Sequence, residues 1–250
     1  MSIESISSSP LDIGEVLGDT FAVIGRTFVV LANLAVLFVG IPAAVSIAGI
    51  ALTPVSPVFA ILTLVGRLAG LAGVLMGYSA IFMVAMADLH GQTVPTERLL
   101  ATAAGKFWPM LGLAILLGLA VGVGVVLLIV PGVVLALAWS VAFPALTLED
   151  RGIFDSFRRS AALTRGKRWS IFLLSFIVWL VAFIIELVLL AAFGGFQGLL
   201  SPQPPLAATV VSQLLGVITV PFAAVLATAL FNQLRGKAGY GAEAVAEVFA

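Results

Sequence analysis

Five long runs of apolar residues with almost no charge constrain what this chain can fold into. They are Thr27–Ile50, Val58–Ala87, Phe107–Leu148, Trp169–Phe193 and Leu206–Phe231. A helix needs about 20 apolar residues to cross a bilayer, so every run is long enough. The apolar fraction is 62%, whereas a soluble domain has roughly 45–50%. We therefore expect an integral membrane protein.

The third run is roughly twice the spanning length. Pro131 and Gly132 stand near its middle, and this pair favours a tight turn between two helices. Lys106 before the run and Arg151 after it belong on one side of the membrane, which requires an even number of crossings. The prediction is an all-α domain over residues 1–250 with six transmembrane helices, arranged as three hairpins: 27–50, 58–87, 108–130, 131–148, 169–193 and 206–231.

The basic residues are distributed unevenly. The loops expected at the hairpin tips carry no charge, and Arg67 is the only basic residue outside the opposite set. That set comprises Arg26, Arg98, Lys106, Arg151, Arg158, Arg159, Arg165, Lys167, Arg168, Arg235 and Lys237. Basic residues in short loops stay cytoplasmic, so both termini are expected inside. The first residues contain acids and serines but no basic segment, so no cleaved signal peptide is expected.

A similar segment precedes each hairpin. The three segments, 10–26, 95–106 and 152–167, each have an acidic residue near their start and continue with small or apolar residues. A basic residue then stands beside an aromatic one where the chain enters the membrane, as with Arg26 and Phe28, and Arg168 and Trp169. We interpret each segment as a cytoplasmic amphipathic helix, so that the same unit occurs three times.

The third of these segments is the most charged part of the chain. At helical spacing its polar face holds Asp155, Arg158, Arg159, Ala162 and Arg165, and its apolar face holds Ile153, Phe154, Phe157 and Ala161. Asp155 is spaced to pair with Arg159. Such a helix lies among lipid headgroups, where each cation near an anionic leaflet contributes roughly 1 kcal/mol. The candidate contacts to anionic phospholipid or a partner are Arg158, Arg159, Arg165, Lys167 and Arg168; the alternative is that they only anchor and orient the protein.

Arg67 and Glu186 are the two ionisable residues inside the predicted spans, at similar depth. Charged residues in a bilayer interior usually face inward and form pairs. We predict a salt bridge between them. It could lock two helices together or line a polar cavity for a substrate or proton; the remaining alternative is that the two never meet.

Glycines at four-residue spacing mark candidate packing surfaces in the second and third spans. They are Gly66, Gly70, Gly73, Gly77, Gly118 and Gly122. Small residues allow helix backbones to approach closely. The expected use is packing within one chain, and the alternative is self-association.

The chemistry of an enzyme is poorly represented. The chain has no cysteine and one histidine, His90, and it lacks phosphate-binding and nucleophile motifs. Asp88 and His90 are expected in a solvated loop. We expect no enzymatic activity, cofactor, metal or nucleic-acid partner. The leading hypothesis is engagement or organisation of membrane lipid or a membrane partner. The alternatives are a transporter or channel using Arg67 and Glu186, and an accessory or protective subunit, with a membrane protein or second copy as partner.

The segment Ile129–Phe172 carries a further pattern: Pro131-Gly132, Pro144, Glu149-Asp150 with Gly152, then Ser160, Leu163-Thr164, Gly166 and Trp169. This pattern, with Leu17–Phe28, resembles a bacterial inner-membrane family. The family includes the membrane domain that precedes some glycerophosphoryl diester phosphodiesterases and free-standing proteins whose function is largely open. The resemblance implies a six-helix inner-membrane domain with cytoplasmic amphipathic helices. The phosphodiesterase catalytic domain is not in the sequence, so that activity is not expected.

Overall fold

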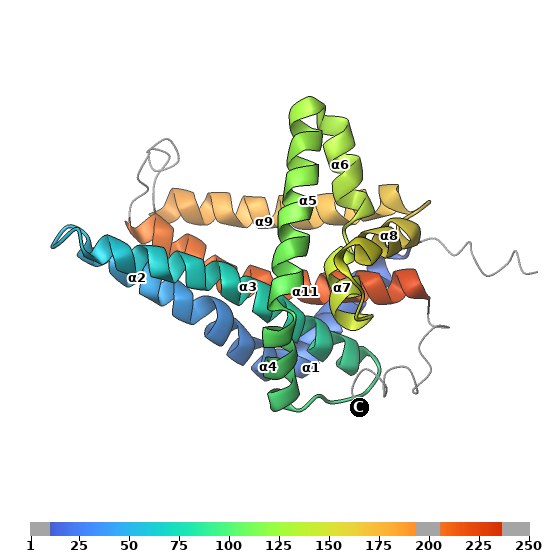
Figure 1. Ribbon diagram of the computed structural model, residues 1–250, viewed down its shortest axis with the longest axis horizontal. Helices are drawn as coiled ribbons and strands as arrows, with labels where there is room; N and C mark the ends of the chain where they lie inside the picture. The colour runs from blue at the N-terminus through green and yellow to red at the C-terminus, as the bar shows by residue number, and fades with distance from the viewer. Residues whose placement is uncertain (1–10, 194–205, 237–250) are drawn as a thin grey trace, which may run out of the picture.

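The structure, a computed structural model, describes residues 11–193 and 206–236, and every regular element in these two ranges is a helix (Figure 1). The predicted charge-free loop 194–205 and Lys237 lie outside the described residues. In chain order the helices are α1 Ile13–Ala35, the π-helix η2 Val36–Gly40, α2 Ile41–Leu52, α3 Phe59–Leu89, α4 Thr96–Gly105, α5 Phe107–Leu127, α6 Ile129–Ala138, α7 Ala142–Leu148, α8 Ile153–Leu163, α9 Arg168–Phe193 and α11 Leu206–Arg235.

Six helical stretches are long and apolar enough to cross a membrane, which confirms the prediction of an all-α chain with six candidate spans. The first stretch combines α1, η2 and α2, and the fourth combines α6 and α7. The remaining four are α3, α5, α9 and α11.

The turn between the third and fourth spans lies earlier than predicted. Leu128 has extended backbone angles, φ −159° and ψ 129°, and separates α5 from α6. Pro131 is instead the third residue of α6, where its missing N–H costs no helical hydrogen bond. Gly132 packs against Val125 of α5, and a Cβ there would collide with Val125. The Pro-Gly pair therefore permits close packing beside the turn, and the turn itself is at Leu128.

The first span changes its helical geometry twice. Thr27, at the predicted start of the span, has non-helical angles of φ −107° and ψ 15°, and its hydroxyl donates to the Val23 carbonyl at 2.7 Å. A threonine that bonds back to its own helix bends that helix. Farther on, the wider π-helix η2 precedes Pro42, whose ring cannot donate a backbone hydrogen bond to the preceding turn. Each deviation thus has a local side-chain cause.

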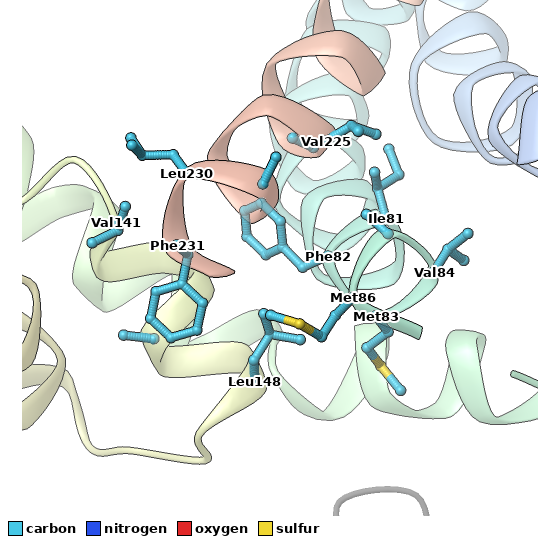
Figure 2. Close-up of a cluster of buried hydrophobic side chains, with 14 of the residues drawn as sticks. Ile81, Phe82, Met83, Val84, Met86, Val141, Leu148, Val225, Leu230 and Phe231 are labelled. Carbon is cyan, nitrogen blue, oxygen red and sulfur yellow. The ribbon is translucent and has the colours of Figure 1, made fainter. Parts of the chain in front are cut away.

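The buried core lies where the N-terminal part of α1, the C-terminal halves of α3 and α11, and α7 meet. Figure 2 shows Phe82 of α3, Leu148 of α7 and Phe231 of α11 converging on one apolar cluster. Away from this core, α2 packs on α3, α5 on α6, and α9 on α11. In Figure 1 the α5–α6 pair runs across the direction of α9 and α11. The helices are therefore packed tightly at one end of the molecule, the packed end. At the opposite end, the open end, the far halves of α3, α5 and α9 expose apolar side chains.

The contact between α2, η2 and α3 is the closest helix packing in the fold, and it depends on small residues. A Cβ on Gly66 would collide with the Ser46 backbone, and one on Gly73 would collide with the Phe38 carbonyl. Because no side chain intervenes, the backbones approach closely and gain dispersion contacts that lipid cannot supply.

The other predicted packing glycines divide into two groups. A Cβ on Gly70 or Gly77 would lie 3.7 or 3.2 Å from its nearest neighbour, which places both residues on the same packed side of α3. A Cβ on Gly118 or Gly122 would have no atom within 4 Å. The glycine pattern of α3 therefore coincides with a helix contact, and that of α5 faces open space.

Replacing Gly73 with alanine should force α3 away from η2. We expect a lower Tm in detergent, by roughly 3–8 °C, because overpacking costs about 1–3 kcal/mol. The matched control is Gly118→Ala, which adds the same methyl group to open space and should leave the Tm unchanged or slightly higher. Equal Tm values for the two variants would show that the α2–α3 contact does not contribute to stability.

Candidate functional site

The charged end of the molecule is organised by the turn between α7 and α8, residues 149–152. Asp150 adopts a left-handed conformation with φ 49°, which aspartate tolerates better than most residues. The turn reverses the chain so that the side chain of Glu149 points inward, where it is only 6% exposed. A buried carboxylate requires several hydrogen-bond donors.

Three guanidinium groups provide these donors. Arg151 in the turn donates to Glu149 Oε2, and Arg159 of α8 donates through Nε and Nη2 at 3.1–3.2 Å. Arg235, the last residue of α11, forms an ion pair with the other carboxylate oxygen at 3.1 Å. These four residues form the Glu149 cluster. The cluster joins α7, α8 and α11 through one carboxylate and leaves two positive charges in excess.

The environment of Glu149 has opposing effects on its pKa. Burial alone would raise the pKa of the carboxyl, because the charged form loses hydration. Hydrogen bonds from Arg151 and Arg159, together with the charge of Arg235, outweigh burial and hold the pKa below its ordinary value. Glu149 is therefore ionised at neutral pH, and its negative charge contributes to holding the cluster together.

The predicted pairing of Asp155 with Arg159 is wrong. Arg159 turns to the buried Glu149, and Asp155 pairs instead with Arg158 at 3.5 Å on the exposed side of α8. The physical reason is that a buried carboxylate attracts a guanidinium more strongly than an exposed one, because water screens it less.

The packed face of α8 includes a row of hydroxyl residues. Ser156, Ser160 and Thr164, at four-residue spacing, are all fully buried. The Ser160 hydroxyl donates to the Ala138 carbonyl at 2.9 Å and accepts from the Val141 N–H at 3.2 Å. It thereby satisfies backbone groups in the break between α6 and α7, which no helical hydrogen bond satisfies. This second role for α8 was not predicted from the sequence.

The apolar side chains of α8 are divided between the protein and its surface. Phe157 packs against Trp139, with ring centroids 4.6 Å apart, whereas Phe154 is 69% exposed. Gly166, with φ 79°, ends the segment in a left-handed conformation that favours glycine. The chain can then turn sharply into α9.

The predicted contact residues on and after α8 have different environments. Arg158 is 82% exposed and Arg165 is exposed, whereas Arg159 belongs to the Glu149 cluster. Lys167 and Arg168 are half-buried. The Arg168 Nε is buried, and no acceptor among the described residues bonds to it. The structure thus leaves Arg158 and Arg165 open to an external ligand.

A pocket of about 540 Å³ opens beside this end of the molecule. Lys106 and Arg151 bring positive charge to it, and Trp108 contributes an aromatic ring that is 73% exposed. Lys106 also forms an ion pair with Asp150. Asp150 lines the pocket as well, and the remaining lining residues are Pro109, Gly152 and Ile153. Two cations and one carboxylate leave one positive charge in excess, which with the indole ring and apolar walls suits a ligand with an anionic head and an apolar body.

Arg67 and Glu186 are not brought together. Arg67 lies on an exposed side of α3, and Glu186 lies on an exposed side of α9. Among the described residues no ion pair joins them. The main contacts of α9 are with α11 and α6. The predicted salt bridge therefore does not form within one chain in this structure.

Other polar residues near this end have structural partners. Arg26, one residue before the kink in α1, donates to Asp88 of α3 at 2.7 and 2.9 Å. His90 Nδ1 lies 2.8 Å from the Met86 carbonyl. Among the described residues no group of three His, Cys, Asp or Glu side chains is placed to hold a metal ion.

The pairing of Glu149 with Arg235 was not predicted from the sequence. Glu149 directly follows an apolar run, and basic residues stand 2 and 10 positions later, which are local signs of a shared carboxylate. Arg235 is 86 positions away from Glu149 in the chain and has no such local sign. Only the packing of α11 beside α7 reveals it.

In comparisons with known proteins, no protein-family model, curated protein or solved structure matches this chain. The resemblance to the phosphodiesterase-associated membrane family therefore stays a prediction.

Replacing Glu149 with glutamine should remove the charge that balances three guanidiniums. We expect the Tm in detergent to fall by roughly 5–10 °C, because breaking a buried ion pair costs about 3–5 kcal/mol. The control is Asp155→Asn, which removes an exposed ion partner on the same helix and should shift the Tm by less than about 2 °C. A similar small shift for both variants would contradict the central role of Glu149.

The contribution of Glu149 to the stability of the protein should decrease as the pH falls. Because its pKa is lower in the folded than in the unfolded state, its stabilising contribution is fully present above the ordinary pKa of about 4.5 and is lost as the pH falls through the folded-state value. The Tm of wild type and of Glu149→Gln can be measured by tryptophan fluorescence at a series of pH values from neutral to acidic. The two Tm values should converge at low pH. A constant difference at all pH values would contradict this assignment.

Proposed function

We propose that this protein is a non-enzymatic membrane protein that engages anionic phospholipid through the basic surface around α8. The observation that carries the proposal is the exposed pair Arg158 and Arg165 beside a cluster with two excess positive charges. In a bilayer this arrangement attracts phosphate headgroups, because each cation near an anionic leaflet contributes roughly 1 kcal/mol.

The aromatic residues around α8 support the same function. Phe154, Trp108 and Trp169 are 69, 73 and 83% exposed. Tryptophan rings concentrate at the boundary between headgroups and hydrocarbon, where the apolar part of the ring meets hydrocarbon and its N–H meets water. Basic residues next to such rings are positioned for phosphate, while the rings occupy the acyl boundary.

The pocket between Lys106 and Ile153 is the proposed headgroup site. Lys106 and Arg151 would contact the phosphate, and Trp108 would cover the glycerol and the first part of the acyl chain. Arg159 is assigned to the Glu149 cluster and positions α8, so we no longer place it among the lipid contacts.

The proposed setting is a bacterial inner membrane with α8 on its cytoplasmic side. Three breaks support three repeated units: the kink at Thr27, the junction at Lys106 and the turn that contains Gly166. Each break precedes an apolar stretch. We infer that the segments before these breaks act as interfacial helices, that the spans form three hairpins, and that both termini are cytoplasmic.

The test is native mass spectrometry of the full chain released from membranes that contain phosphatidylglycerol and phosphatidylethanolamine. We expect the wild type to retain phosphatidylglycerol. Arg158→Gln with Arg165→Gln should weaken this retention by roughly one to two orders of magnitude, because about 2 kcal/mol is lost. The matched variant, Arg158→Lys with Arg165→Lys, keeps the charge and should retain the lipid.

The outcomes separate the competing functions. Equal retention by wild type and the glutamine variant would overturn the lipid proposal. A stoichiometric protein that replaces the lipid would favour the accessory-subunit alternative. Solute uptake by reconstituted protein that depends on Arg67 and Glu186 would favour the transporter alternative.

A further inference from the structure

Two charged side chains in the apolar spans face outward. Arg67 of α3 and Glu186 of α9 are both exposed, and neither forms an ion pair with another described residue. A charged group in contact with hydrocarbon is costly, and such residues usually have an opposite charge nearby. The residues that the structure describes provide no such partner at either position.

The two residues lie at similar distances from the ends of their helices. Arg67 follows the start of α3, Phe59, by eight residues, and Glu186 precedes the end of α9, Phe193, by seven. These separations correspond to about 12 Å and about 11 Å along the two helices. The start of α3 and the end of α9 lie at the same side of the molecule, at the left in Figure 1. Both charges therefore lie about two helical turns in from the helix ends at that side.

Glu186 continues an exposed aromatic stripe on α9. Trp169, Phe172, Phe176, Trp179 and Phe183 recur every three or four residues, and Glu186 occupies the next position of this series. Neighbouring ring centroids in the stripe are 5.2–6.3 Å apart. A repeat of this period places all these side chains on one face of a helix.

Arg67 lies on a complementary surface. Leu64, Leu68 and Leu71 are exposed around it on α3, while Gly66 and Gly73 face α2 and η2 on another side of the helix. One surface thus presents a cation among leucines, and the other presents a carboxylate after a row of aromatic rings. A guanidinium can bond a carboxylate through two N–H groups and stack on an adjacent ring at the same time.

We propose that a second copy of this chain covers these surfaces, with Arg67 of one copy paired to Glu186 of the other. Opposite charge, outward exposure and similar distance from the helix ends carry the proposal. This self-association uses surfaces distinct from the basic surface around α8 and does not depend on lipid binding there.

Cysteine cross-linking provides a direct test, because the natural chain contains no cysteine. One copy carries Arg67→Cys and a differently tagged copy carries Glu186→Cys. A short bis-methanethiosulfonate reagent is used in membranes, since the Cα atoms of an Arg–Glu pair are too far apart for a direct disulfide. We expect a mixed dimer between the two tagged chains. Val126→Cys, paired with Glu186→Cys, is the control, because Val126 is equally open on α5.

The cross-linking outcomes are decisive in both directions. Mixed dimers well above the Val126 control would support the proposal. Yields equal to that control would overturn it. A cross-link within one chain that carries both cysteines, without mixed dimers, would also overturn it and would show that α3 and α9 meet inside the monomer.

Charge exchange tests the ion pair itself. Arg67→Glu and Glu186→Arg should each weaken self-association roughly tenfold, as measured by native mass spectrometry at a series of protein concentrations. The chain with both changes restores opposite charges and should recover it. Recovery would not be expected if the single changes acted only by disturbing the fold, and failure to recover would contradict the proposed pair.

Discussion

The ionised carboxylate of Glu149 is the interaction on which the arrangement of the helices at the packed end depends. It connects the α7–α8 turn, α8 and the end of α11, three parts of the chain that apolar packing alone would not hold in one orientation. The carboxylate is buried, so its attraction for three guanidiniums is weakly screened. The same geometry removes Arg159 from the surface and leaves Arg158 exposed. One structural ion cluster thus determines which cations remain available to a ligand.

The packed end and the open end follow different physics. At the packed end, residues such as Phe82 and Phe231 form a core of the kind found in soluble proteins, with hydroxyls of α8 satisfying free backbone groups. At the open end, helices in contact with lipid gain nothing from excluding apolar surface, so only close-packing residues such as Gly66 and Gly73 hold neighbours together. The α5–α6 pair has glycines that face open space, and it contacts the remaining helices mainly near its base.

The sequence predicted the features that depend on composition and local pattern. Long apolar runs specify six candidate spans. The predicted start of the first span, residue 27, coincides with the kink at Thr27. That kink is a local feature, since the Thr27 hydroxyl bonds to a carbonyl four residues earlier. Local pattern could not locate the turn at Leu128, where Pro131 suits the beginning of a helix as well as a turn. Nor could it reveal the pairing of Arg235 with Glu149, since that contact depends on how distant helices pack. The Asp155–Arg159 prediction failed for the same reason: helical spacing permits a pair, and a better partner outside the helix decides it.

The position of charge along the spans connects these observations. Near the packed end, acidic side chains pair with cations from other parts of the chain. Asp88 pairs with Arg26, and Glu149 pairs with three arginines. Toward the open end, Arg67 and Glu186 are exposed, and neither forms an ion pair with another described residue. A bilayer does not solvate such groups, and water cannot replace a partner there. The exposure of these two opposite charges is what the proposed pairing with a second copy would satisfy.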